Sequence, residues 1–300
     1  MNYIRKSILQ GILVAFSVVG TGVSFSSCSS EELDPVSVFA SETTEVQNDF
    51  DRWLEKNYVD NYNIEFKYRF EFNESDKSYN LIAADYNKSI ALSKLIKFLW
   101  LETYEELCGT DFIRSYCPKV IFLIGSPAYD ESGSVVLGAA EGGLKISLFN
   151  VNGINTENLN VEELNKWYFK TMHHEFGHIL NQKKSYPTEF NEVSAKNYQS
   201  ESWVNLTDQE ALDMGFVSNY ASSEASEDFV EILSIYVTND AAYWDNLVSS
   251  ASETGQQAIN AKLNIVKSYC KETFGFDLDN LRRIVQRRSA EVVDLNLNLD

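Results

Sequence analysis

The protein has 300 residues, of which 44% are hydrophobic and 13% aromatic, and its 44 acidic and 25 basic side chains give a formal net charge of −19. This aromatic and apolar content excludes a disordered chain and is sufficient for the core of one enzyme-sized domain. The negative charge argues against a nucleic-acid partner, because the phosphate backbone would be repelled.

The N-terminal end has the pattern of an export signal. Two basic residues precede an apolar stretch over residues 8–19, and small residues then lead to Cys28. The stretch is too short for a permanent membrane span, which indicates a cleaved leader. Small residues before a cysteine also resemble a bacterial lipobox, although Phe25 stands where leucine is usual, so cleavage near Ser27 without lipidation is the alternative. We predict a lipoprotein signal peptide over residues 1–27, with Cys28 as the lipid anchor.

Residues 28–45 are mostly polar, with an acidic run near their start, as expected for a tether between a lipid and a folded domain. The run also resembles the acidic export tag of Bacteroidetes lipoproteins that are delivered to the cell surface, and a plain solvated linker is the alternative. The resemblance implies an outer-membrane lipoprotein exposed on the cell surface. We expect one folded domain over residues 46–300.

Three cysteines remain in this domain, so at least one of them has no disulfide partner within it. A bridge between Cys108 and Cys117 is plausible across a short loop in an exported protein, but the sequence alone does not establish it. Cys270 has no near neighbour of its kind along the chain. None of the three has the close pairing typical of a cysteine zinc site, so we expect structural cysteines.

The first half of the domain predicts a sheet with covering helices. After a short helix through residues 50–54, residues 64–72 alternate apolar and polar side chains, which is the period of a half-buried strand. Residues 91–107 place apolar side chains at helical spacing. Residues 120–124 are a buried-type strand, and a glycine-rich stretch leads to a further strand candidate over residues 143–151.

From residue 161 onward, helical patterns dominate. Asn160 can cap a helix over residues 161–180, and a polar connector with Pro187 and Trp203 follows. Further helices are predicted over residues 208–213, 223–238, 256–274 and 278–293. The expected fold is therefore α+β, with a mixed-sheet N-terminal lobe and a helical C-terminal lobe.

Residues 174–178 read His-Glu-Phe-Gly-His, the HExxH pattern, within the predicted helix over residues 161–180. On a helix, His174 and His178 lie on one face and can direct their imidazoles at one ion, with Glu175 beside them. A catalytic zinc takes three protein ligands and keeps an open position for water, whose proton a nearby carboxylate can accept. The pattern predicts a Zn²⁺ site with Glu175 as general base. The alternative is that these histidines are ordinary surface or core residues of a helix.

The composition limits the third ligand. The chain has three histidines, and His173 points about 100° away from His174 on the helix, so a carboxylate is expected instead of a third histidine. The downstream candidates are Glu189, Glu192, Glu201, Glu210, Glu224, Glu227 and Glu231. We choose Glu227, because it lies one helical turn before Glu231, so that one carboxylate can bind the metal while Glu231 orients a ligand imidazole. A solvated helix face is the alternative for both.

The motif helix and the residues around Glu227 resemble those of known enzymes. The motif helix, followed by Tyr220 seven positions before Glu227, is similar to the zincins related to anthrax lethal factor and the clostridial Pro-Pro endopeptidases. Residues 138–151, the motif helix and residues 220–231 together resemble the Bacteroidetes zinc metallohydrolase lipoproteins associated with SusC/SusD-type import systems. The similarity extends over most of the chain after the leader.

The resemblance implies a zincin-like fold with a gluzincin-like ligand set. The implied zinc ligands are His174, His178 and Glu227. Glu175 would be the base, and Tyr220 would stabilise the oxyanion, with an ordinary core aromatic as the alternative for Tyr220. Zincins also resemble one another in an edge strand that pairs with the substrate backbone. Residues 144–148 are a candidate for that strand, and an interior strand is the equal alternative.

The sequence therefore predicts a zinc-dependent hydrolase, specifically a metallopeptidase acting on peptide or protein substrates and anchored by its lipid near a SusC/SusD-type nutrient importer. A non-catalytic accessory lipoprotein, which binds peptide or glycan and keeps a structural zinc, is the alternative from another class. Hydrolysis of a non-protein amide is a third reading. The intact Glu175 favours an enzyme, because a structural site has no need of a base.

Overall fold

The computed structural model describes residues 47–129, 133, 135–136, 138–141 and 144–299. The predicted signal peptide, the acidic tether and the lipidation site at Cys28 lie outside these residues. Within the described part of the chain, no helix is both long and apolar enough to cross a membrane.

The main sheet has four strands in the order β1-β2-β6-β5. These strands are β1 (Glu65–Lys67), β2 (Val120–Leu123), β5 (Gly138–Glu141) and β6 (Lys145–Leu148). β2 pairs in parallel with β1 and β6, whereas β5 pairs antiparallel with β6, so the sheet is mixed, as predicted. Residues 144–148 thus supply an interior strand, and β5 is the outer neighbour of β6. A separate antiparallel pair is formed by β3 (Ala128–Tyr129) and β4 (Val135–Val136).

The strand predicted over residues 64–72 is wrong in its length, because only the three residues of β1 pair with β2. Beyond β1, the Tyr68 hydroxyl and the Arg69 guanidinium donate to Oδ1 of Asp51 at 2.8 and 2.9 Å, which ties the chain to the first helix. The chain therefore leaves the sheet after three residues. The alternating pattern fits an extended segment that buries Phe66 and Tyr68 but pairs with another strand only at its start.

Helices cover the N-terminal part of the domain. They are α1 (Asp49–Leu54), α2 (Asp60–Tyr62), α3 (Tyr86–Ile96), α4 (Glu102–Cys108) and α5 (Thr110–Tyr116). π-helical turns at Glu55–Val59 and Lys97–Leu101 join α1 to α2 and α3 to α4. The helix predicted over residues 91–107 is confirmed, and it begins five residues earlier at an N-cap on Asp85, whose side chain accepts from the Lys88 N–H.

The C-terminal part is helical, as predicted. Its helices are α6 (Val161–Leu164), α7 (Lys170–Lys183), α8 (Glu189–Val193), α9 (Asp208–Asp213), α10 (Ala225–Thr238), α11 (Ala241–Ser249), α12 (Glu253–Phe274) and α13 (Leu278–Glu291). A π-helical turn, Asn165–Phe169, joins α6 to α7, and Asn160 caps α6 as expected. Helices α5, α8 and α11 were not predicted from the sequence. The Asp240 side chain, which accepts from the Tyr243 N–H at 2.8 Å, was the available signal for the start of α11.

The possible bridge between Cys108 and Cys117 is absent, and both thiols are free. Helix α5 lies between the two cysteines, and its seven residues span about 10 Å, beyond the reach of a disulfide between its ends. The Cys117 thiol instead faces the carbonyl of Tyr62 at 3.5 Å. Cys270 is also free and fully buried.

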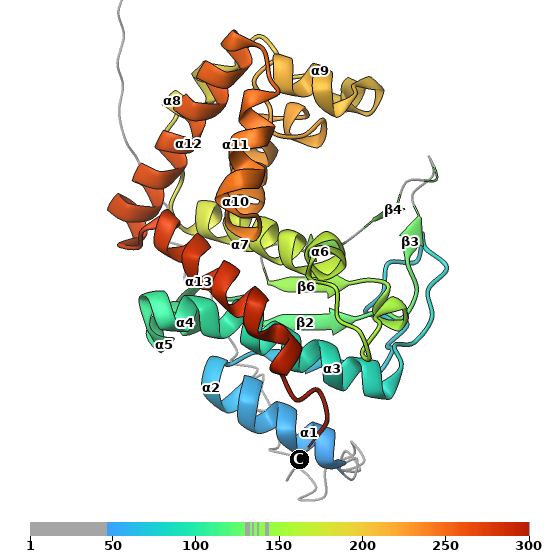
Figure 1. Ribbon diagram of the computed structural model, residues 1–300. Helices are drawn as coiled ribbons and strands as arrows, with labels where there is room; N and C mark the ends of the chain where they lie inside the picture. Colours follow the sequence, from blue (N-terminus) through green and yellow to red (C-terminus); the bar gives the residue numbers. More distant parts are fainter. Residues whose placement is uncertain (1–46, 130–132, 134, 137, 142–143, 300) are drawn as a thin grey trace, which may run out of the picture. The chain divides into compact units, whose positions relative to one another are not determined.

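Helix α7 lies between the sheet and α10 (Figure 1). On the sheet side, Gly138 of β5 approaches Thr171 so closely that an added Cβ would overlap its Cγ2. On the other side, a Cβ at Gly177 would stand 2.8 Å from Cγ1 of Val230. These glycines permit close approach on both faces of α7. Helix α10 is itself buried at every position from Asp228 to Thr238, as expected for a helix that is apolar on most sides.

Candidate metal centre

Helix α7 places the two motif histidines on one face. The rings of His174 and His178 lie with their centroids 4.9 Å apart and their planes nearly perpendicular. His174 is largely buried, and His178 is half-buried. Both rings direct Nε2 at the same carboxylate of the neighbouring helix, which is the arrangement that the four-residue spacing predicted.

That carboxylate belongs to Glu227, in the first turn of α10. One Glu227 oxygen lies 3.0 Å from Nε2 of His174, and the other lies 3.3 Å from Nε2 of His178. One ligand atom from each of these three residues lies within 4.8 Å of the others. The structure therefore brings together the three residues that the sequence selected, and among the described residues this is the group found with metal-ligand geometry.

Glu231, one turn further along α10, lies on the opposite side of His174. Its Oε1 accepts from Nδ1 of His174 at 2.9 Å, and its carboxylate is 1% exposed. A hydrogen bond at Nδ1 fixes the tautomer that leaves the Nε2 lone pair free for a metal. The position of Glu231 is thus the one expected of a group that orients a ligand imidazole.

Two further residues hold Glu231, and sequence reasoning missed both. The Lys170 ammonium and the Ser218 hydroxyl donate to Oε2 of Glu231 at 2.9 and 2.7 Å. Lys170 lies four residues before His174 on α7, so its spacing was the signal that could have found it. Ser218 lies in the connection between α9 and α10, where no periodic pattern marks it.

The electrostatics of the cluster call for a cation. Burial lowers the pKa of His174, but Glu227 and Glu231 outweigh it and raise that pKa to about 9. Burial raises the pKa of Glu227, but His174 and His178 outweigh this effect and hold that pKa far below its usual range. The carboxylates of Glu227 and Glu231 thus both favour a positive charge at the His174 imidazole. Two nitrogens and a carboxylate at this spacing, with a surplus of negative charge, fit a Zn²⁺ ion.

Glu175 and Tyr220 border the cluster. Burial raises the pKa of Glu175, and the negative charges of Glu227 and Glu231 add to that effect against the pull of the two histidines. The Tyr220 ring lies 6.0 Å from the His174 ring and 5.0 Å from the Trp203 ring, centroid to centroid. Burial and the neighbouring Glu227 raise the pKa of the Tyr220 phenol, so it keeps its proton and can donate it in a hydrogen bond.

His173 takes no part in the cluster. It is fully buried, and its Nδ1 lies 2.8 Å from the hydroxyl of Tyr104, a residue of α4. Burial lowers the pKa of His173 to about 3, so the ring is neutral. The prediction that His173 points away from His174 is confirmed.

Comparison with known proteins identifies the family. A protein family described as "Putative zinc-binding metallo-peptidase" matches residues 42–279. The chain belongs to this family. A crystal structure of a protein of the same description from Bacteroides caccae is 45% identical, with a TM-score of 0.74, and the match covers 83% of this chain and 94% of that one. The search of curated proteins gave no match. The predicted zinc cofactor is thereby confirmed, and the zinc-binding metallopeptidases are the group to which this protein belongs.

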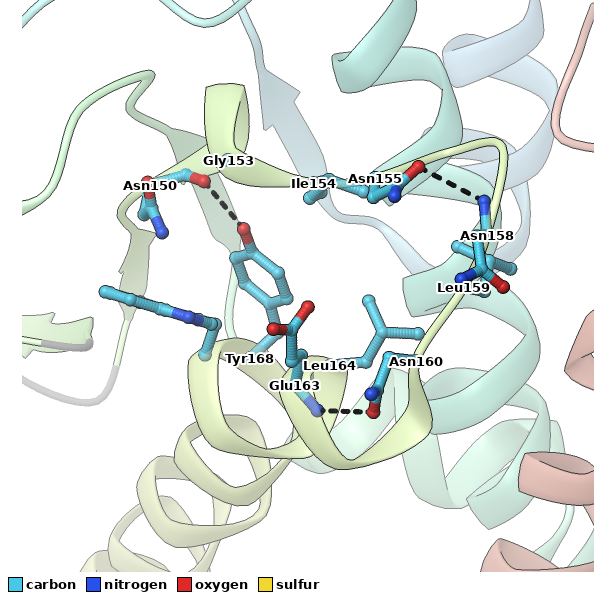
Figure 2. A pocket seen from close by; sticks show the side chains of 11 residues that line it. Asn150, Gly153, Ile154, Asn155, Asn158, Leu159, Asn160, Glu163, Leu164 and Tyr168 are labelled. Atoms are coloured by element: carbon cyan, nitrogen blue, oxygen red, sulfur yellow. Dashed lines mark hydrogen bonds between the residues drawn. The ribbon is translucent and has the colours of Figure 1, made fainter.

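Two hollows in the surface lie outside the group formed by His174, His178 and Glu227. Figure 2 shows one of about 100 Å³, in which several polar groups already form hydrogen bonds within the protein. Asn155 accepts from the backbone of Asn158, Asn160 from that of Glu163, and the Tyr168 hydroxyl donates to the Asn150 carbonyl.

The second hollow, of about 580 Å³, borders the two residues that hold Glu231. Its lining comprises Lys170, Asp208, Leu212, Val217, Ser218, Ile235, Asn239, Tyr243, Asn246 and Leu247. It is the larger of these two spaces, and it reaches Lys170 and Ser218 although none of the proposed metal ligands lines it.

Proposed function

We propose that this protein is a zinc-dependent peptidase in which His174, His178 and Glu227 hold the metal. The observation that supports this most strongly is the convergence of both Nε2 atoms on one carboxylate, with Glu231 fixing His174 from behind. This is a gluzincin-like ligand set, with two histidines from an HExxH helix and a glutamate from a second helix. The Tyr220 spacing adds the similarity to lethal-factor-type zincins.

Each neighbouring residue has a role in peptide hydrolysis. When bound, zinc would lower the pKa of a water molecule and polarise the scissile carbonyl. Glu175 takes the proton of the attacking water and returns it to the leaving amine, for which its raised pKa is suited. Tyr220 donates a hydrogen bond to the oxyanion that develops on the carbonyl oxygen. Glu231 keeps the His174 ring in its orientation throughout.

The role of Glu175 separates an enzyme from an accessory protein with a structural zinc. We expect the protein without residues 1–27 to carry about one zinc per chain. Glu175→Gln should keep that zinc while hydrolysis of a diverse peptide library falls by roughly 10²- to 10⁴-fold, the range of general-base catalysis. If the wild type holds zinc and cleaves no peptide, the accessory function or a non-protein amide substrate gains support.

We also propose that the chain is an outer-membrane lipoprotein that acts near an importer of the SusC/SusD type. The support is the leader of residues 1–27, Cys28 and the acidic run that follows. Metabolic labelling with a fatty acid should mark the wild type and not Cys28→Ala. Protease treatment of intact cells then tests exposure on the cell surface. Labelling of Cys28→Ala to the wild-type level would refute the anchor.

A further inference from the structure

A fully buried ion pair lies beside the proposed metal ligand Glu227, at the next position of α10. Lys262 of α12 and Asp228 of α10 both have completely buried side chains, and Nζ of Lys262 lies 2.5 Å from Oδ2 of Asp228. Asp228 follows Glu227 in the sequence, and its Oδ2 also accepts from the Tyr198 hydroxyl at 2.9 Å. Such a pair is costly to bury and is weak evidence for stability by itself, which raises the question of what it holds in place.

The same ammonium group reaches the segment that carries Tyr220. Nζ of Lys262 donates to the Gly215 carbonyl at 2.9 Å and lies 4.1 Å from the centre of the Phe216 ring. Gly215 has a φ of +94°, and a Cβ there would stand 2.6 Å from Cβ of Ala258 on α12. Only glycine fits both the backbone angle and the close approach, so the sequence brings this carbonyl to Lys262.

One buried cation therefore joins two parts of the chain that deliver active-site groups. Through Asp228 it contacts the first turn of α10, which carries Glu227. Through Gly215 it contacts the start of residues 215–223, which carry Ser218 and Tyr220. Neither contact touches the metal ligands, so Lys262 can act only through the placement of these groups.

We infer that Lys262 is a positioning residue, which holds residues 215–223 against α10 so that the Tyr220 phenol faces the reaction centre. The inference rests on the proposed function, because it gives Tyr220 a part in hydrolysis. Other bonds also restrain the segment: the backbone of Ser222 accepts from the Gln199 N–H at 2.7 Å, and the Asn219 N–H donates to Asp208 at 3.0 Å. We therefore expect a moderate loss of rate when the Lys262 contact is removed.

The test uses the double variant Lys262→Met with Asp228→Asn. Removing both charges avoids an uncompensated buried carboxylate, so the fold should survive. The amide oxygen that Asp228→Asn introduces can still accept from Tyr198, but the Gly215 carbonyl loses its donor. We expect kcat to fall about tenfold with KM within about twofold of the wild type, because an oxyanion donor acts in the transition state. Zinc content should stay at about one per chain.

A second background shows whether the effect passes through Tyr220. In Tyr220→Phe, the double variant should lower kcat by less than about twofold further, since residues that act through one group are not additive. Lys267→Met is the matched control, because Lys267 lies on the same helix in a surface pair with Asp279 at 2.8 Å. It should leave kcat unchanged. A full tenfold loss in the Tyr220→Phe background, or no loss in the wild-type background, would overturn the inference.

Hydrogen exchange keeps the test independent of peptidase activity. In the double variant we expect faster exchange in peptides that cover residues 215–223, and unchanged exchange in α7 and the rest of α10. If the wild type cleaves no peptide, the proposed function fails, but this measurement still decides whether Lys262 holds the segment. Unchanged exchange over residues 215–223 would contradict the positioning role in either case.

Discussion

The two faces of α10 handle buried charge in opposite ways. Toward α7, Glu227 and Glu231 lie with Glu175 around two histidines and Lys170, and negative charge is in excess. Toward α12, Asp228 and Lys262 form a matched pair. Glu227 and Asp228 are consecutive, so a turn of about 100° along the helix separates the two arrangements. The charges of the Asp228 face are balanced within the protein, whereas under the proposed function a zinc ion balances the excess negative charge of the other face.

The largest expected effect breaks the matched face. Lys262→Met alone leaves Asp228 buried without its cation and should lower the free energy of unfolding by about 3–5 kcal/mol. Chemical denaturation of the zinc-loaded protein measures this loss, with Lys267→Met as the surface control, for which about 1 kcal/mol or less is expected. A loss below about 1 kcal/mol for Lys262→Met would show that the buried charge of Asp228 does not depend on Lys262, and the contrast between the two faces would fail.

On the other face, Glu227→Ala should weaken zinc binding by about 70- to 900-fold. Structural zinc sites with four ligands bind with about 10–16 kcal/mol, so one ligand corresponds to about 2.5–4 kcal/mol. Competition with a chromophoric chelator measures the affinity. Glu224→Ala, an exposed glutamate three residues earlier, is the control and should bind zinc as the wild type does. Full zinc affinity in Glu227→Ala would assign the third ligand to another carboxylate.

The same contrast explains what the sequence could predict. His174 and His178 follow from helical spacing, and Glu227 follows from the scarcity of histidines and the periodicity of α10, since both arguments are local. Lys262 lies 34 positions after Asp228, and no local pattern links them. Their pairing depends on how α12 packs against α10, which periodicity does not determine.

The fold shows the same limit. Helices over residues 91–107 and 161–180 were predicted because their apolar periodicity is long. The alternation over residues 64–72 predicted a strand of full length, yet the side chains of Tyr68 and Arg69 bind Asp51 and draw the chain away from β2. The local pattern describes an extended segment correctly, but tertiary contacts determine how much of that segment pairs with β2. The short helices α5, α8 and α11 lack enough turns for a clear period.

A smaller effect is expected from the residue that orients His174. Glu231→Gln should weaken zinc binding by about 10- to 100-fold, the range found for residues that support metal ligands from behind. The amide retains the shape of the carboxylate but lacks the charge that Lys170 and His174 balance. The chelator competition used for Glu227→Ala measures it. An affinity loss as large as that of Glu227→Ala would make Glu231 a ligand itself.

The smallest expected effect tests the contact that brings the metal-binding face together. In Gly177→Ala, the new Cβ would stand 2.8 Å from Cγ1 of Val230, so α7 and α10 must shift apart or Val230 must change its rotamer. One added methyl group in a tight contact should lower the free energy of unfolding by about 1 kcal/mol. It should also weaken zinc binding several-fold, because Glu227 moves with α10 while the histidines stay on α7.

Adding Val230→Ala to Gly177→Ala frees the space and should restore zinc affinity. Rescue of affinity by a substitution that touches no ligand would show that the spacing of the two helices sets the geometry of the site, whereas persistent loss in the double variant would place the fault in the motif helix itself.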